Sequence, residues 1–246
     1  MNLKNKNVVV VGATGGIGRV MSLAFALKGS NVILVGRDRK ILSSLDTKLK
    51  ERGCVSQILA VDVTKPAGVD KLSKLLRHGH IDVIVHAAGV GIYKSLESLT
   101  FDEWKKSFDV NVNSVFLVIK HLLPLLKKAQ EGYVLVTGSG MGKLAVAKRS
   151  AYCASKFALR GFIMSLAKEY KGTGINFVHL TLGSVLTSFG PLTLEEKVKK
   201  VKEGKSYITP AYLAHTVVTK LENGSLKTET PVYPRKYFSE SKSGKT

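Results

Sequence analysis

A glycine-rich turn between an apolar strand and an apolar helix constrains the fold of this chain most. Four consecutive valines, Val8–Val11, lead into Gly-Ala-Thr-Gly-Gly-Ile-Gly at Gly12–Gly18, and an apolar helical pattern follows. Glycines let the backbone approach a pyrophosphate, and the free amides and positive dipole end of a helix favour an anion. The alternative is a turn that only punctuates the chain. We predict a dinucleotide site here, with contacts from Gly12, Thr14, Gly15, Gly16, Ile17 and Gly18.

Strand-like and helical segments alternate along the rest of the chain. Short apolar runs suit parallel strands that are buried on both faces. With 246 residues and 44% hydrophobic content, the chain can bury one full core without a linker or a repeat. We predict an α/β fold, a doubly wound parallel sheet of seven strands with helices on both faces. The expected strands lie near residues 7–11, 31–36, 55–61, 81–87, 132–138, 174–182 and 231–233.

The second expected strand ends in Gly36-Arg37-Asp38-Arg39, where dinucleotide folds contact the adenosine ribose. An acidic residue at the strand end would accept from a 2′-hydroxyl and repel a 2′-phosphate, but Gly36 stands there. Arg37 offers a planar fork of donors to a phosphate. We predict NADP(H) over NAD(H), with Arg37 as the main anchor and Arg39 as an adjunct. Asp38 leaves room for NAD(H), and the alternative is a solvated Arg37 beside a helix-capping Asp38.

Tyr152 and Lys156 stand four residues apart in a segment, residues 150–170, that we predict to be a helix. Side chains with this spacing share one helix face, so the ammonium group can favour a phenolate. An unperturbed tyrosine has a pKa of about 10, and a nearby positive charge lowers it. The same spacing also arises by chance, so its meaning depends on the accompanying motifs.

These motifs occur in an order that resembles the short-chain dehydrogenase/reductase family, in its compact single-domain form. The match extends from about Lys6 to Ala214, and Ser139 precedes Tyr152 by thirteen residues, as in that family. The resemblance implies a Rossmann-like fold and hydride transfer between a nicotinamide and a carbonyl or hydroxyl carbon. The matching elements after the glycine turn are Asp62-Val63, Ala88-Gly89, Asn111, Ser139, Tyr152 and Lys156.

The resemblance also implies roles for four catalytic residues. Tyr152 exchanges the proton with the substrate oxygen, Ser139 holds that oxygen, and Lys156 lowers the Tyr152 pKa and binds the nicotinamide ribose. Asn111 interrupts its helix and holds a water in a proton relay to Lys156. An amide that satisfies neighbouring backbone is the alternative reading of Asn111. Asn111, Tyr152 and Lys156 are also predicted cofactor contacts.

Further cofactor contacts are expected where other strands end. Asp62 can accept from the adenine amine, or it can cap a helix instead. Gly89 lets the backbone pass close to the ribose, and Thr187 can bond the nicotinamide carboxamide. The complete set of these contacts is Asp62, Val63, Ala88, Gly89, Gly183, Val185 and Thr187.

Two motifs depart from the family pattern. His86-Ala87 replaces the usual Asn-Asn, and we expect His86 to be a core histidine with its hydrogen bonds satisfied. Leu182 replaces the proline before Gly183, which leaves the following loop less fixed.

The chain has 38 basic and 18 acidic residues, a net charge of +20. Such a balance can attract nucleic acid, an anionic membrane or an acidic protein. The lysines lie mainly on expected solvent faces and no basic stretch has interleaved aromatics, so a solubility role is favoured. We expect one domain at residues 1–234, a substrate lid at about 184–207, and a basic, disordered tail at 235–246.

The leading functional hypothesis is an NADP(H)-dependent oxidoreductase acting on a small hydrophobic ketone or alcohol. One alternative is a 3-oxoacyl-carrier-protein reductase, whose partner would be an acidic carrier protein. The other is a non-catalytic nucleotide sensor that binds nucleic acid, although the Asn-Ser-Tyr-Lys set argues against it. The resemblance implies dimers or tetramers. The scattered histidines predict no metal site, the polar start predicts no membrane span, and two free thiols favour the cytoplasm.

Overall fold

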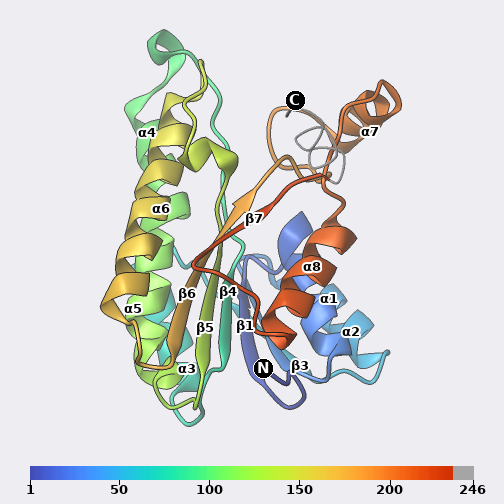
Figure 1. Cartoon of the computed structure of the whole chain (residues 1–246), viewed down its shortest axis with the longest axis vertical. Helices are drawn as coiled ribbons and strands as arrows, with labels where there is room; N and C mark the ends of the chain where they lie inside the picture. Colours follow the sequence, from blue (N-terminus) through green and yellow to red (C-terminus); the bar gives the residue numbers. More distant parts are fainter. Residues whose placement is uncertain (235–246) are drawn as a thin grey trace, which may run out of the picture.

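A seven-stranded parallel sheet forms the centre of the molecule, in the order β3-β2-β1-β4-β5-β6-β7 (Figure 1). The structure is a computed structural model that describes residues 1–234, so the predicted tail at 235–246 lies outside the described residues. The strands are β1 (Asn7–Val11), β2 (Asn31–Gly36), β3 (Ser56–Ala60), β4 (Val83–His86), β5 (Gly132–Thr137), β6 (Ile175–Leu182) and β7 (Glu229–Val232).

Helices cover both faces of this sheet (Figure 1). Helices α1 (Gly16–Leu27), α2 (Arg39–Lys50) and α8 (Pro210–Glu222) cover one face. Helices α3 (Pro66–Leu76), α5 (Ser114–Leu126) and α6 (Ser150–Glu169) cover the other. Helix α4 (Phe101–Phe108) joins α5 through a π-helical turn, Asp109–Asn113, and α7 (Leu194–Lys202) stands beyond the strand ends.

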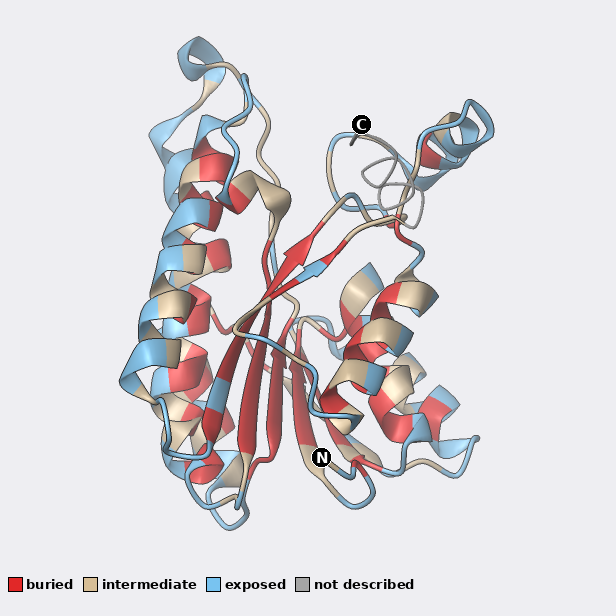
Figure 2. Cartoon of the chain, viewed as in Figure 1, coloured by how far each residue is buried: buried red, intermediate tan, exposed pale blue. Residues whose placement is uncertain are grey.

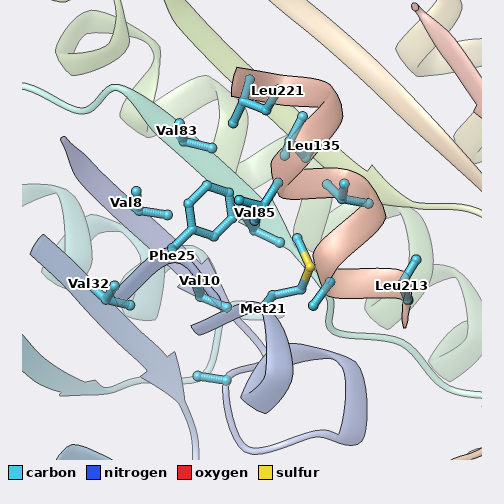
Figure 3. Close-up of a cluster of buried hydrophobic side chains, with 14 of the residues drawn as sticks. Val8, Val10, Met21, Phe25, Val32, Val83, Val85, Leu135, Leu213 and Leu221 are labelled. Carbon is cyan, nitrogen blue, oxygen red and sulfur yellow. The ribbon is translucent and has the colours of Figure 1, made fainter. Parts of the chain in front are cut away.

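Alternate residues of each strand face two separate hydrophobic cores. Val8 and Val10 pack with Met21 and Phe25 of α1, as Figure 3 shows. Val9 and Val11 instead face the core beneath α3 and α5. Because both faces of the central strands are buried (Figure 2), continuous apolar runs were the correct signal for this sheet.

The sequence-based prediction of the fold is confirmed. Every neighbouring strand pair is parallel, and β1 pairs with both β2 and β4, which is where the winding direction reverses. Strand β7 begins at Glu229, two residues before the predicted Pro231, and α6 ends at Glu169 instead of Tyr170.

One helical stretch in the described part of the chain, Phe101–Leu126, is long and apolar enough to cross a membrane. It comprises α4, the π-helical turn and α5, and Val115, Val118 and Leu122 belong to the core beneath it. Packing against the sheet accounts for the apolar residues on the buried face of this stretch.

Candidate active site

A cavity of about 770 Å³ lies at the carboxyl ends of the strands. Open parallel sheets bind ligands at this edge, next to the point where the strand order reverses. The cavity is bordered by residues that follow six strands: Gly12, Arg37, Asp62, Ala88, Ser139 and Gly183.

The glycine turn forms one wall of this cavity through Gly12, Thr14, Gly15, Gly16 and Ile17. Gly12 has a φ of 79°, and a Cβ there would lie 2.6 Å from the Ala88 nitrogen. Gly18 does not line the cavity. A Cβ on Gly18 would lie 2.0 Å from the Gly12 carbonyl oxygen, so this glycine lets α1 pack against the turn.

Arg37 also lines the cavity, at the end of β2. Its neighbour Asp38 caps α2, because the Asp38 carboxylate accepts a hydrogen bond of 3.0 Å from the Ile41 amide. The capping alternative for Asp38 is therefore confirmed. Arg39 is exposed, begins α2 and lies outside the cavity lining, so the structure does not bring this predicted adjunct to the site.

Asp62 lies on the cavity wall after β3. Its carboxylate accepts from the Thr64 amide at 3.0 Å and from the Thr64 hydroxyl at 2.8 Å. Burial alone would raise the Asp62 pKa, but these bonds and the charge of Arg37 outweigh burial and hold the pKa below its ordinary value. Asp62 is therefore an ionised acceptor at neutral pH. Val63 beside it and Gly89 across the cavity also contribute to the lining.

Tyr152, Lys156 and Ser139 meet in the same cavity. Tyr152 and Lys156 share one face of α6 as predicted and are 5% and 3% exposed. The Lys156 ammonium donates to the Thr137 carbonyl at 2.9 Å and lies 5.8 Å from the centre of the Tyr152 ring. The Ser139 hydroxyl accepts from the Met141 amide at 3.1 Å, which fixes the serine beside the tyrosine.

The predicted lowering of the Tyr152 pKa is wrong for the ligand-free protein. Burial raises the Tyr152 pKa, because a phenolate loses its hydration in this site, and the Ser139 hydroxyl opposes the shift. The ammonium of Lys156 is occupied by the Thr137 carbonyl, and burial lowers its own pKa to about 8. At neutral pH, therefore, Tyr152 is a protonated phenol.

Asn111 lies in the π-helical turn, so the predicted interruption of the helix is present. Its Oδ1 accepts from the Val90 amide at 2.9 Å, and its Nδ2 donates to the Val90 carbonyl at 2.9 Å and to Ser155 Oγ at 3.0 Å. The side chain is buried and lies outside the cavity lining. It ties the segment after β4 to α6, which is the structural alternative for this residue.

The loop after β6 brings Gly183, Val185 and Thr187 into the cavity lining. Thr187 lies against the glycine turn, since a Cβ on Gly16 would be 2.6 Å from Thr187 Cγ2. Lys197 of α7 anchors this loop. Its ammonium donates to the Thr187 carbonyl at 2.7 Å and to the Phe189 carbonyl, and the residue is only 6% exposed.

Lys197 was missed from the sequence because its neighbours are solvated lysines of the same helix. Lys197 is the buried residue of α7, while Leu194 and Val201, which share its face by helical period, are exposed, so no periodic pattern separated it from the other lysines. Burial lowers the Lys197 pKa, yet both carbonyls accept from the charged group.

His86 is buried in β4 as expected, but its hydrogen bonds are only half satisfied. Its Nε2 lies 3.1 Å from Ser114 Oγ, whereas Nδ1 has no partner among the described residues. Burial lowers the His86 pKa to about 3, so the ring is neutral. A second buried histidine, His179 of β6, fills the space beside Gly138, and burial lowers its pKa to about 4.

Aromatic rings complete the surroundings of Tyr152. The Tyr93 ring meets the Tyr152 ring edge-on with centroids 5.3 Å apart, and the Phe189 ring lies 6.0 Å away. Other apolar residues in the cavity lining are Val110, Leu144, Val146 and Leu192. The Tyr152 ring is therefore packed against two aromatic rings, and apolar side chains form part of the cavity around it.

Comparisons with known proteins agree with this geometry. Residues 6–197 match the short chain dehydrogenase family. An uncharacterized oxidoreductase of Listeria monocytogenes is 30% identical over 184 residues, which cover 74% of each chain. An alcohol dehydrogenase from the archaeon Thermococcus sibiricus, solved with 5-hydroxy-NADP, is 29% identical with a TM-score of 0.81 and covers 93% of this chain and 95% of its own. A metagenomic short-chain oxidoreductase solved with NADP is 26% identical with a TM-score of 0.80, covering 95% and 99%.

Proposed function

The chain belongs to the short chain dehydrogenase family of oxidoreductases, and we propose that it transfers hydride between NADP(H) and the carbonyl or hydroxyl carbon of a small hydrophobic ketone or alcohol. The observation that carries this proposal is a single cavity that contains the glycine turn, Arg37, Ser139, Tyr152 and Lys156 together. The residues suited to bind a dinucleotide and the group suited to donate a proton thus line the same cavity.

The residues present fit NADP(H). Within residues 1–234 no carboxylate forms an ion pair with the Arg37 guanidinium, while the Asp38 carboxylate that would repel a 2′-phosphate is held in the cap of α2. Gly12 to Ile17 present backbone to a pyrophosphate at the start of α1. Two of the similar solved structures contain NADP or a derivative of it, which supports the same choice here.

When bound, NADP(H) supplies or accepts the hydride. The residues of this chain handle the proton and the substrate oxygen. In reduction, the carbonyl carbon gains the hydride, Tyr152 gives its proton to the carbonyl oxygen, and a secondary alcohol forms. Ser139 donates to that oxygen as charge develops on it. The raised Tyr152 pKa keeps the phenol protonated in the ligand-free protein, so the proton is present before a substrate binds.

Lys156 is proposed to restore the proton to Tyr152. With a pKa near 8 it is charged at neutral pH and can still exchange a proton within the working range of an enzyme. Both Nδ2 hydrogens of Asn111 are already donated to protein groups. A relay water at this residue would therefore have to donate to the second lone pair of its Oδ1.

A 3-oxoacyl-carrier-protein reductase is the second candidate. Exposed lysines on α7, among them Lys199 and Lys202, stand beside the cavity and would suit an acidic carrier protein. Under either candidate, residues 184–207 are proposed to act as the substrate lid, anchored by Lys197.

Initial rates with NADPH and NADH over a panel of ketones test the proposal. Arg37→Ala removes a charge-assisted contact worth about 1.5–3 kcal/mol, so the KM for NADPH should rise roughly 10- to 100-fold. The KM for NADH should stay within about twofold, since NADH lacks the 2′-phosphate. Lys40→Ala removes an exposed cation nearby and serves as the control. Equal effects of Arg37→Ala on both cofactors would refute the phosphate contact, and no turnover of any ketone would refute the proposed reaction.

A further inference from the structure

The cavity lining carries an unbalanced positive charge on its substrate side. Lys106 of α4, Arg149 just before α6 and Lys205 of the lid belong to it, whereas the ammonium of Lys197 is already bound by two backbone carbonyls. Asp62 is the only carboxylate among the described lining residues, and it follows β3 at the opposite edge of the sheet from α6. A neutral ketone gives no reason for this excess of cations.

Arg149 is the cation of this set that lies against Tyr93, a residue in contact with Tyr152. Its guanidinium stacks over the Tyr93 ring at 4.8 Å from the centroid, and its Nη1 lies 3.5 Å from the Met141 sulfur. No carboxylate of the described chain pairs with it. A guanidinium has five N–H donors, so most of this fork remains available to a ligand.

The start of α6 adds to the field at the same place. Arg149 is the N-cap residue of this 20-residue helix, no side chain caps it, and its first turn has no acidic residue. The free amides at a helix start carry a partial positive charge that favours an anion. The stacked fork and the helix start therefore point to one kind of ligand group.

The distance to the chemistry is short. The Tyr93 ring contacts both groups, with its centroid 4.8 Å from the Arg149 guanidinium carbon and 5.3 Å from the centroid of the Tyr152 ring. A planar carboxylate matches the two parallel donors of the fork. An anion bound there would be connected to the reacting carbonyl by only a few bonds.

We infer that Arg149 is a substrate-binding residue and that the substrate is a short oxo acid, or the corresponding hydroxy acid in the reverse direction. This inference rests on the proposed function. In reduction the ketone carbon takes the hydride from NADPH and the ketone oxygen takes the proton from Tyr152. The products are the hydroxy acid and NADP⁺, and the carboxylate remains bound to Arg149 without reacting.

Matched pairs of oxo acids and their methyl esters test this inference, for example levulinate and methyl levulinate, with longer and shorter oxo acids completing the panel. Each pair has one skeleton and differs in charge, so the ratio of kcat/KM values for acid and ester isolates recognition of the carboxylate. Arg149→Gln should lower kcat/KM for the preferred acid about 10- to 100-fold and leave its ester within about threefold. Arg149→Lys keeps the charge but loses the fork of donors, so its kcat/KM for the preferred acid should lie between the values of the wild type and Arg149→Gln.

Lys148→Gln is the matched control, because Lys148 is the exposed neighbour outside the cavity lining and its loss changes net charge equally. It should leave the ratio unchanged. The inference would be overturned if Arg149→Gln left the acid-to-ester ratio unaltered, or if the wild type preferred the ester in every pair. In both cases reduction of the esters would still support the proposed reaction. Turnover of neither member of any pair, nor of neutral ketones, would overturn the proposed reaction itself.

Discussion

Lys156→Met is predicted to abolish activity without destabilising the ligand-free protein. Burial lowers the Lys156 pKa from 10.5 to about 8, a difference worth about 3 kcal/mol of unfavourable charge burial. Methionine removes this unfavourable burial of charge. It also leaves the Thr137 carbonyl without its 2.9 Å hydrogen bond, which costs about 1–3 kcal/mol. The free energy of unfolding at neutral pH should therefore equal the wild-type value or exceed it by up to about 2 kcal/mol.

The pH dependence gives the sharper readout. The folded-state pKa of Lys156 lies below the unfolded-state pKa, so the unfolded chain binds more protons between about pH 8 and about pH 10.5. The free energy of unfolding of the wild type should therefore rise as pH increases through this window, by up to about 3 kcal/mol. Lys156→Met lacks the titrating group and should lack this rise. Tyrosines and other lysines titrate in both proteins, so the difference between the two curves isolates Lys156.

Urea unfolding followed by circular dichroism, at several pH values and without nucleotide, measures both quantities. Lys168→Met removes an exposed lysine from the same helix and should follow the wild-type curve. Parallel curves for wild type and Lys156→Met would refute the assigned burial of charge. If Lys156→Met lowered the free energy of unfolding by more than about 3 kcal/mol at neutral pH, the hydrogen bond to Thr137 would outweigh the cost of burying the charge.

Two further substitutions test the supports of the site. Lys197→Met leaves the Thr187 carbonyl without its donor and should weaken NADPH binding about tenfold by calorimetry, with Lys199→Met, an exposed position on α7, unchanged. Gly138→Ala places a Cβ about 2.1 Å from His179 Nε2, so the free energy of unfolding should fall by about 1–3 kcal/mol. In a His179→Ala background Gly138→Ala should cost much less than in the wild type, and an unchanged cost would place the clash elsewhere.

Sequence patterns predicted the sheet because its strands are buried on both faces. A continuous apolar run such as Val8–Val11 is typical of a parallel strand whose two faces are both covered, as they are here. The start of strand β7 was harder to predict, because its first residue, Glu229, is charged and does not belong to an apolar run. That carboxylate accepts from Arg160 at 2.8 Å and from Thr181 at 3.1 Å, and these long-range partners were not visible locally.

The fold brings Ser139, Tyr152 and Lys156 to one cavity, but their electrostatics did not follow from spacing. The four-residue interval sets Tyr152 and Lys156 on one helix face, yet it contains no information on the Thr137 carbonyl that binds the ammonium. Burial then determines both pKa shifts. The same limitation hid Lys197, whose position against the loop after β6 depends on how α7 docks.

The motif that contains Arg37 and Arg39 does not by itself show which of the two arginines faces the cofactor site. Both follow the same strand and both were assigned to a 2′-phosphate. Once Asp38 caps α2, Arg39 becomes the first residue of that helix and lies outside the cavity lining. The capping bond, which depends on where the helix begins, decides between the two arginines.

Tyr152→Phe tests the central claim most directly, because it removes one hydroxyl and keeps the ring between Tyr93 and Phe189. NADPH binding and ketone reduction should be measured on the same preparation, with a substrate that the wild type reduces. A proton donor at this position predicts an NADPH Kd within about twofold of wild type and a reduction rate lower by about 10²- to 10⁴-fold. Reduction at the wild-type rate by protein that still binds NADPH would contradict the account.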